Sequence, residues 1–414
     1  MNTQPSDKKK DLLKRYGYRF GQMRLRTMSH LGLDVFETER FGCYSKDMDG
    51  KLFLDALSVQ GVFNLGRRHP VIVEAMKKGL ESLDMGNNFF MSEERLQLAD
   101  KLAETTPGDI NCFFFSSTGS EAVDLAIKVA RGYTSRPGII SATECYHGIT
   151  GFALSTNSNP DYVEPFGPLV PEFSHVPFGD LSALKNEMTE KTAAVIFEPM
   201  ISEAGLLIPP DDYFSGVREL CDAHESLLII DEVVSGLGRT GKIWGIEHFE
   251  GVVPDIMVSG KGLSAGMYPM AATMFREEVA DFFLTYPFCH YSSTSGSDLG
   301  CVAASAMIDI INQPEFLSEV NRKGARLADG YRELLKRFPD LLESYGQLGL
   351  HTALRLADSS GGFRMNHYLA EEGVFALLAT NDTSAIRIQP PLIITDDEID
   401  KILDALGRAL KKMN

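Results

Sequence analysis

Short apolar runs alternate with longer amphipathic segments between residues 110 and 275, and this alternation limits the possible folds more than any other feature of the chain. The runs have five or six residues, too few for a helix, and lie at 112–117, 138–142, 193–197, 227–231, 255–259 and 270–275. Segments such as 120–134 and 213–224 instead repeat apolar residues with the period of a helix. Apolar strands alternating with helices predict an α/β fold with a mostly parallel sheet covered on both faces.

The rest of the chain has a different pattern. After residue 300, long amphipathic helices at 317–338 and 396–413 surround short strands at 351–356 and 385–389, which is typical of a smaller α+β domain. Residues 1–60 contain too little regular pattern to fold alone, and 414 residues exceed the usual size of a single core. We therefore expect a large domain at 61–300, a small domain at 301–414, and an N-terminal segment at 1–60 that packs with the small domain or with a second subunit.

Charge and composition exclude several classes of partner. A net charge of -17 disfavours nucleic acid, and the basic run at 7–15 is too short to reverse that balance. No apolar stretch is long enough for a membrane span, and the N-terminus lacks the apolar core of a signal peptide. Six scattered cysteines without a C-x-x-C pair favour reduced thiols over a disulfide framework or metal site. We expect a cytoplasmic protein without a metal, a membrane or nucleic acid.

The stretch "VSGKG" at 258–262 places Lys261 directly after an apolar run. A lysine at such a position usually lies at the rim of the protein, with its stem on apolar surface and its ammonium in water. A desolvated lysine of lowered pKa could instead form a Schiff base with a carbonyl group. The other strand ends decide between these interpretations.

Unusual polar residues follow two further strands. Thr118, Gly119 and Ser120 begin a helix after the run 112–117, and this could be a phosphate cradle or an ordinary helix cap. Asp231 closes the apolar run 227–231, where a carboxylate needs a cationic or hydrogen-bonding partner. The candidate partners are Arg239 and the protonated nitrogen of a heteroaromatic ligand.

Together these strand ends supply the three contacts that pyridoxal phosphate needs. A lysine holds the aldehyde, a carboxylate keeps the pyridine nitrogen protonated, and a cradle binds the phosphate. Because ligands of open α/β sheets lie beyond the carboxyl ends of the strands, we expect these residues to converge there. Tyr146, which follows the run 138–142, could stack on the pyridine ring or be an ordinary buried aromatic.

The segment "IIDEVVSGLGRTGKIWGIEHFEGVVPDIMVSGKGLSAGMYPMAATM" closely resembles the signature of class III aminotransferases, the group with ornithine, acetylornithine, 4-aminobutyrate and putrescine aminotransferases. The likeness extends from "DGKLFLDALSVQGVFNLGRRHP" to "AIRIQPPL", most of the chain. This resemblance implies a fold type I transferase that depends on pyridoxal phosphate. It also implies a homodimer with active sites at the subunit interface.

The resemblance assigns roles to residues at the cofactor. It makes Lys261 the Schiff-base lysine and proton shuttle, and Asp231 the partner of the pyridinium. Tyr146 would stack on the ring beside His147, and Gly119 and Ser120 would bind the phosphate. Another phosphate contact would come from the neighbouring subunit, where "HYSSTSGSDLG" offers Ser293 or Thr294.

At the positions that concern the substrate, some residues of this chain match the pattern of the family and others differ from it. Arg387 in "IRIQPPL" and Glu203 in "ISEAGLL" match an arginine that binds a substrate α-carboxylate and a glutamate that masks it; alone, Arg387 would suggest a rim ion pair. Val234 stands where ornithine-type members have a glutamine, and a valine at this position also occurs among ω-amine transaminases. Gln60 stands where ornithine aminotransferase has a pocket tyrosine. "SGSDLG" also departs from the usual G-G-N-P-L run.

These residues predict an aminotransferase that moves an amino group from an ω-amine or diamine type of donor to a keto acid such as 2-oxoglutarate or pyruvate. Other pyridoxal-phosphate enzymes of this fold, such as a racemase, an epimerase, or a decarboxylating or carbon-carbon bond-forming enzyme, would use the same carbanion. A noncatalytic relative that serves as a binding module is a third interpretation. Retention of Lys261, Asp231 and the phosphate residues argues against it, because a buried carboxylate is costly without a ligand.

Overall fold

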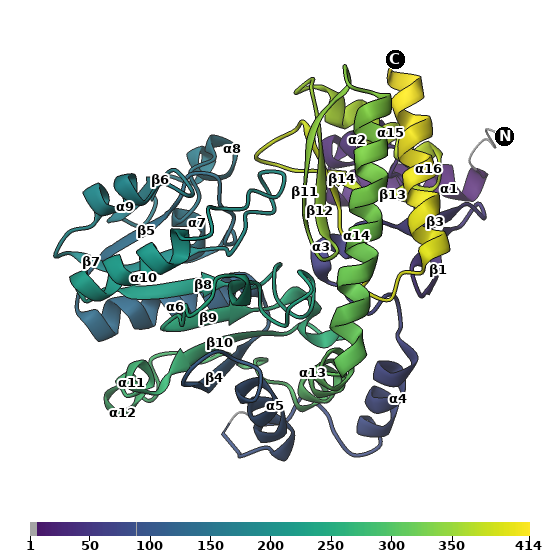
Figure 1. The fold of residues 1–414 in the computed structure, drawn as a ribbon. Helices are drawn as coiled ribbons and strands as arrows, with labels where there is room; N and C mark the ends of the chain where they lie inside the picture. The colour runs from purple at the N-terminus through teal and green to yellow at the C-terminus, as the bar shows by residue number, and fades with distance from the viewer. Residues whose placement is uncertain (1–5, 88) are drawn as a thin grey trace.

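The computed structural model describes residues 6–87 and 89–414, and its largest feature is a seven-stranded sheet (Figure 1). In sheet order the strands are β4 (Ile110–Ser116), β10 (Ala271–Arg276), β9 (Ile256–Ser259), β8 (Leu227–Asp231), β7 (Thr192–Phe197), β5 (Gly138–Ala142) and β6 (Phe173–Val176). The pairs from β9 to β6 are parallel, whereas β10 runs antiparallel to both β9 and β4. The sheet is mixed but mostly parallel, so the predicted α/β class is confirmed.

Helices cover both faces of this sheet because the strand side chains alternate between two apolar cores. Val195 and Ile230 lie in one core, with side chains from α5 (Glu93–Ala103), α10 (Tyr213–His224) and α13 (Asp298–Ile311). Ile196 and Ile229 lie in the other, with α6 (Gly119–Thr134), α11 (Glu277–Ala280) and α12 (Phe282–Thr285). Shorter helices complete this part of the chain: α4 (Pro70–Gly79), α7 (Gly151–Ser155), α8 (Pro160–Val163) and α9 (Leu181–Glu187).

The strand at 112–117, expected to be buried, is only partly covered. Four consecutive side chains of β4, from Cys112 to Phe115, have intermediate exposure. The reason is its position, since β4 is the edge strand of the sheet in this chain.

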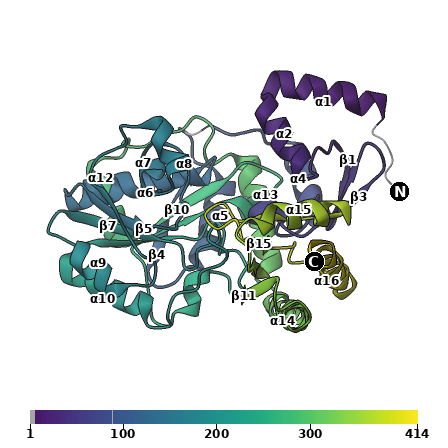
Figure 2. The same ribbon diagram turned by 90° about the horizontal axis from the view of Figure 1, so that it is seen from above.

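The C-terminal part has a separate core, which it shares with the N-terminal segment. An antiparallel sheet of β11 (Leu342–Leu348), β12 (His351–Leu356), β15 (Ala385–Ile388) and β14 (Leu377–Leu378) packs with α14 (Pro314–Arg337), α15 (Gly361–Glu371) and α16 (Asp396–Met413). β13 (Val374–Phe375) pairs with β3 (Leu52–Asp55), which continues through β2 (Tyr44–Asp47) to β1 (Glu37–Phe41). Helices α1 (Asp7–Phe20) and α2 (Gln22–His30) lie outside this sheet (Figure 2). The boundaries at residues 60 and 300 remain predictions.

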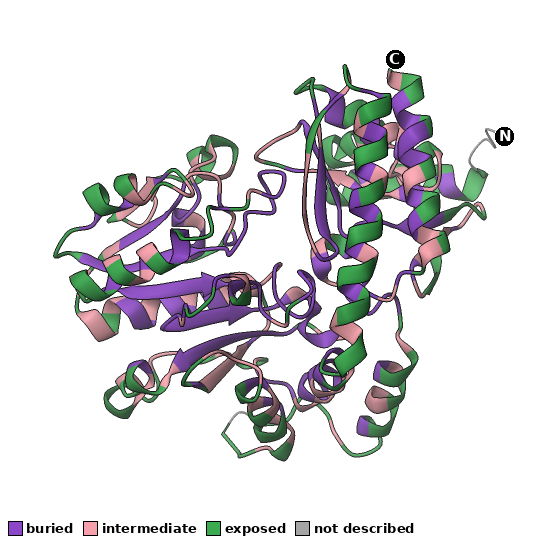
Figure 3. Ribbon diagram, viewed as in Figure 1, coloured by how far each residue is buried: buried purple, intermediate pink, exposed green. Residues whose placement is uncertain are grey.

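Six strands of the large sheet, β6 among them, run in the same direction, so their carboxyl ends meet at one edge. β5, β7, β8 and β9 are parallel, and β4 has the same direction because it and β9 are both antiparallel to β10. The central strands are buried (Figure 3), so polar residues just beyond their carboxyl ends lie at the inner end of a solvent-accessible recess. Among the described residues, no helix is long and apolar enough to cross a membrane.

Candidate active site

A cavity of about 190 Å³ opens at this sheet edge and collects most of the residues singled out from the sequence. Its lining comes from loops that follow β4, β5, β7, β8 and β9 and from the segment after β3: Gln60, Thr118, Gly119, Ser120, Tyr146, His147, Gly148, Glu198, Asp231, Val233, Val234 and Lys261. The strand ends therefore converge as expected for a ligand site of an α/β sheet.

Lys261 lies two residues beyond β9, at the start of a short 3₁₀ helix (Lys261–Ser264). Its backbone has φ 43°, a left-handed conformation that a non-glycine residue adopts only when its surroundings enforce it. Loss of hydration lowers the pKa of its ammonium, although the carboxylates of Glu203, Asp231 and Glu198 oppose the shift. Burial therefore makes it easier for Lys261 to lose its proton, and the neutral amine is the form that can attack a carbonyl carbon.

The partner of Asp231 in this chain is a histidine. Asp231 Oδ2 lies 2.8 Å from His147 Nδ1, and Asp231 Oδ1 accepts the backbone N–H of Val233 at 2.9 Å. Burial opposes a charge on His147, but the neighbouring Cys145 and Asp231 raise its pKa well above the usual value. Arg239, considered as a partner, lies elsewhere and donates to Ser58, Asn64 and the carbonyls of Leu350 and Pro390. That interpretation is wrong.

Glu198 lines the same cavity and was missed in the sequence. Glu198 directly follows β7, just as Asp231 ends β8 and Lys261 follows β9. Its carboxylate accepts the backbone N–H of Tyr146 at 3.1 Å. Burial, together with the charge of Asp231, raises the pKa of Glu198 to about 7. The run "AAVIFE" carried the signal, because a carboxylate at the end of a buried strand is costly unless it has a function or a partner.

The segment 118–120 forms a helix cap and lines the cavity with the first turn of α6. Thr118 is the N-cap of α6, and its side chain accepts the N–H of Glu121 at 3.2 Å, as the cap interpretation predicted. The N–H groups of Gly119 and Ser120 belong to the first turn, where a helix leaves its donors without helical partners. Gly148 packs so closely on Ser120 that any Cβ at position 148 would collide with it. The first turn of α6 is therefore held tightly beside the Tyr146 loop.

Gln60 reaches the cavity from a strained turn. Ser58, Val59 and Gln60 have φ values of 48°, 49° and 59°, so three consecutive non-glycine residues are left-handed, each at a cost of roughly 1–2 kcal/mol. Asp55 offsets this strain by accepting the N–H groups of Leu57 and Ser58 at 3.0 and 2.6 Å. Backbone hydrogen bonds, rather than local propensity, thus determine where the Gln60 side chain lies.

Glu203 and Arg387 form a buried ion pair near the cavity, and their charges act on Lys261. Arg387 Nη1 donates to Glu203 Oε1, and Arg387 Nη2 donates to the carbonyl of Leu378 at 3.2 Å. Burial alone would raise the pKa of Glu203, but the charge of Arg387 and the Thr380 hydroxyl lower it below the usual value. Arg387 is only 1 % exposed, so the pair does not lie at a rim.

Ser293 and Thr294 are outside the cavity of their own chain. Both are exposed, and Thr294 Oγ1 lies 3.2 Å from the hydroxyl of Ser117, one residue before the α6 cap. This position tests neither residue as a phosphate ligand of a second subunit, and that role remains a prediction.

The residues present fit pyridoxal phosphate. The cavity contains an amine of lowered pKa, a buried carboxylate and the free N–H groups of a helix start. Asp231 uses one hydrogen bond on each oxygen, and a carboxylate can accept about four, so it retains capacity for the pyridinium N–H. Tyr146 and His147 border the space between these groups.

Comparison with known families agrees with this chemistry. Residues 27–410 match the family model described as "Aminotransferase class-III". A curated relative described as "Uncharacterized aminotransferase", from Archaeoglobus fulgidus, is 41% identical over 403 residues, which cover 97% of this chain and 94% of the relative.

Solved structures show the same architecture. An aminotransferase from Bacillus anthracis superposes with a TM-score of 0.91 at 25% identity, covering 99% of this chain and 100% of the other. A transaminase from the marine bacterium Virgibacillus gives 0.86 at 29% identity, with coverage of 91% and 93%. The ornithine aminotransferase of Toxoplasma gondii, whose structure is described with partial occupancy of pyridoxal phosphate, gives 0.84 at 28% identity, with coverage of 91% and 90%.

Proposed function

Because the chain belongs to the class III aminotransferases, which depend on pyridoxal phosphate, we propose that it transfers an amino group from an ω-amine or diamine donor to a keto acid such as 2-oxoglutarate or pyruvate. Transamination needs a site that accepts two different molecules in turn. One is an amine that can lack an α-carboxylate, and the other is a keto acid that carries one.

The buried pair of Glu203 and Arg387 carries this proposal. A buried guanidinium binds a carboxylate through two parallel hydrogen bonds, which suits the α-carboxylate of a keto acid or glutamate. When the bound amine has no such group, an unpaired buried arginine would be costly, and Glu203 neutralises it. The same cavity can therefore serve both halves of the reaction.

Lys261 is the proposed catalytic residue. Pyridoxal phosphate, when bound, supplies an aldehyde carbon for the amino group and a protonated ring that accepts the electrons released at the substrate's α-carbon. Lys261 would hold the cofactor and, once the incoming amine has taken its place there, would remove the proton from the substrate's α-carbon and deliver it to the cofactor carbon that carried the aldehyde. Its lowered pKa suits this role, because a general base must be unprotonated near neutral pH.

The remaining cavity residues hold the cofactor in this proposal. Asp231, oriented by His147, accepts the pyridinium N–H, and Tyr146 stacks on the ring. The N–H groups of Gly119 and Ser120 bind the phosphate. Thr118 caps the helix that presents them.

Two residues would distinguish this chain from ornithine-type members. Val234 borders the ring with an apolar side chain, and Gln60 offers an amide to the substrate. We further propose a cytoplasmic homodimer in which Ser293 or Thr294 completes the phosphate site of the partner subunit.

The test is the Arg387→Ala variant, assayed separately in each half-reaction. We expect the second-order rate constant for 2-oxoglutarate to fall about a hundredfold, because truncation of a buried, charged clamp costs several kcal/mol, and the rate constant for a diamine to fall far less. Glu203→Gln is the matched control, because it removes the charge that masks Arg387 and keeps Arg387 itself. Lys261→Ala gives the background rate in the absence of the catalytic lysine. Equal losses for keto acid and diamine in Arg387→Ala would contradict the proposal.

A further inference from the structure

Glu203 has a second partner besides Arg387, on the loop between β14 and β15. Thr380 Oγ1 donates to Glu203 Oε2 at 2.6 Å, and the Thr380 backbone N–H approaches the same oxygen at 3.3 Å. Glu203 Oε1 meanwhile accepts from Arg387. The two carboxylate oxygens are therefore divided between a cation and a neutral hydroxyl.

The loop that carries Thr380 is fixed to the large-sheet side of the cavity. Asn381 Nδ2 donates to the carbonyl of Glu144 at 2.8 Å, and Asn159 Nδ2 donates to Asn381 Oδ1 at 2.8 Å. The backbone N–H of Asn381 also donates to the carbonyl of Glu203 at 2.9 Å. Asn381 holds the loop, and with it Thr380, in place. Because Thr380 cannot follow the Glu203 side chain when that side chain leaves Arg387, the hydrogen bond between Thr380 and Glu203 breaks.

This bond favours one of the two states that the proposed function requires. A substrate α-carboxylate replaces Glu203 on Arg387 and compensates for the lost ion pair, but it offers nothing to the Thr380 hydroxyl. We propose that Thr380 is a positioning residue that latches Glu203 over Arg387 and so sets how readily the site exchanges an amine for an α-carboxylate substrate. The inference rests on the proposed role of Arg387 as the carboxylate clamp.

The latch predicts opposite effects on the two classes of substrate. Affinity for an α-carboxylate is reduced by the fraction of molecules in which Arg387 is free, so a weaker latch raises that affinity. Amines without this carboxylate need Glu203 on Arg387, and for them a weaker latch is unfavourable. General damage to the site would instead weaken both classes.

Thr380→Val removes the hydroxyl and nearly keeps the shape of the side chain. In the holoenzyme, we expect the calorimetric dissociation constant of glutarate, a dicarboxylate that does not react, to fall about fivefold, the effect of one hydrogen bond of ordinary strength. KM for 2-oxoglutarate should fall with it, while KM for a diamine should rise or stay constant. Thr380→Ser should restore the parent values, because it keeps the donor.

Thr383→Val is the matched control on the same loop, since the Thr383 hydroxyl donates to the carbonyl of Ser359 and not to Glu203. Glutarate binding that is unchanged or weaker in Thr380→Val, or a Thr380→Ser variant that behaves like Thr380→Val, would overturn the latch. Glutarate binding to Arg387→Ala distinguishes a failure of the carboxylate clamp from a failure of the latch. If it leaves glutarate affinity intact, the clamp fails; if it weakens glutarate while Thr380→Val does not tighten it, only the latch fails.

Discussion

Two buried carboxyl groups at neighbouring strand ends have different environments. Asp231 is paired with His147 and a backbone N–H, so its charge is compensated on both oxygens. Glu198 accepts the N–H of Tyr146, and burial together with the charge of Asp231 raises its pKa and favours its protonated form. Glu198 can therefore lose its proton near neutral pH beside Lys261, whose charge, like that of His147, opposes the shift.

Glu198→Gln should change how stability depends on pH. The folded protein keeps the Glu198 proton up to a pKa of about 7, whereas the unfolded chain loses it near 4.5. The contribution of this group is thus fully present below pH 4.5 and is lost as the pH rises towards 7. In that window the free energy of unfolding of the variant, relative to the parent, should rise by up to about 1.4 kcal/mol per pH unit.

Thermal unfolding of the apo forms at several pH values across and above this window measures the effect. Glu187→Gln, at an exposed position in α9, controls for the loss of one carboxylate. If Glu198→Gln and the parent show parallel pH profiles, Glu198 does not titrate as described.

Sequence reasoning found the site residues that directly follow apolar strands, because the edge of a parallel sheet is a simple geometric rule. Asp231, Lys261 and Tyr146 came from that rule, and Glu198 obeys it as well but was missed. Thr380 could not be found in this way, since it lies in a loop and its significance depends on contacts with Glu203 across the fold. The resemblance, rather than periodicity, drew attention to Arg387.

At the scale of elements, periodicity predicted helices better than it predicted burial. The segment 213–224 coincides with α10, and α16 occupies the predicted 396–413. Burial of β4 was overestimated because a run of aromatic residues does not reveal that its strand is at an edge. The left-handed turn before Gln60 was equally hidden, because hydrogen bonds to Asp55, rather than glycine residues, stabilise it.

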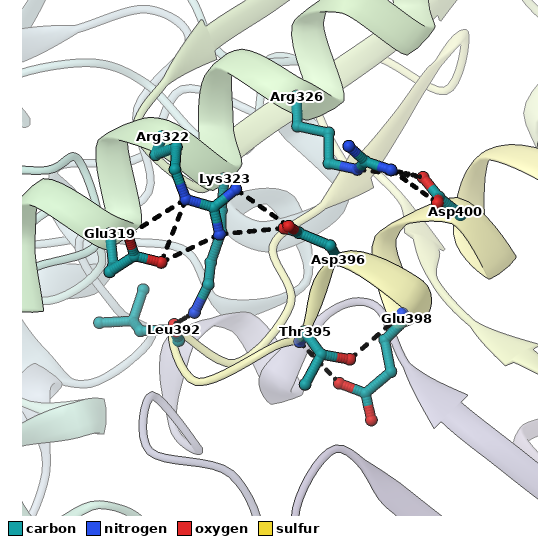
Figure 4. Close-up of polar contacts among 9 residues, drawn as sticks. All are labelled: Glu319, Arg322, Lys323, Arg326, Leu392, Thr395, Asp396, Glu398 and Asp400. Carbon is teal, nitrogen blue, oxygen red and sulfur yellow. Dashed lines mark hydrogen bonds and ion pairs between the residues drawn. The ribbon is translucent and has the colours of Figure 1, made fainter.

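Helix α16 starts with a capping box that helps to fix the C-terminal core (Figure 4). Thr395 Oγ1 accepts the N–H of Glu398 at 3.3 Å, and Glu398 Oε2 accepts the N–H of Thr395 at 2.8 Å. Nearby, Arg322 of α14 donates to Asp396 at 3.0 Å. This exposed ion pair contributes little, so the cap is the stronger local determinant of where α16 begins.

Thr395→Ala should lower the free energy of unfolding by about 1 kcal/mol, because it leaves an N–H at the helix start without its acceptor. Urea denaturation followed by circular dichroism measures this change, and Thr395→Ser should retain most of the parent stability. Turnover of the folded enzyme should remain the same, since the cap is exposed at the start of α16 and does not line the cavity. Equal stability of Thr395→Ala and the parent would show that the cap is dispensable.

At the scale of the whole molecule, several large apolar side chains are exposed together on one surface. Phe89, Phe90 and Met91 are 72%, 70% and 99% exposed, and the ring of Phe89 stacks on that of Tyr291 with centroids 5.5 Å apart. We call these four residues the aromatic patch. Thr294 is three residues beyond Tyr291, so the proposed phosphate contact and the patch belong to the same surface. We therefore expect the partner subunit of the proposed homodimer to cover the patch.

Phe90→Asp therefore tests assembly and cofactor binding together. A charge at a buried interface position should raise the dimer dissociation constant roughly thirtyfold or more, as expected for a loss of at least about 2 kcal/mol. Sedimentation velocity over a range of protein concentrations measures this shift. Titration of the apo form should show weaker binding of pyridoxal phosphate at concentrations where the variant is monomeric, and affinity should return as the concentration rises.

Phe363→Asp, on α15, adds the same charge at another exposed phenylalanine and should leave both properties unchanged. A parent protein that sediments as a monomer and still binds the cofactor tightly would contradict the shared site, because Ser293 and Thr294 lie outside the cavity of their own chain.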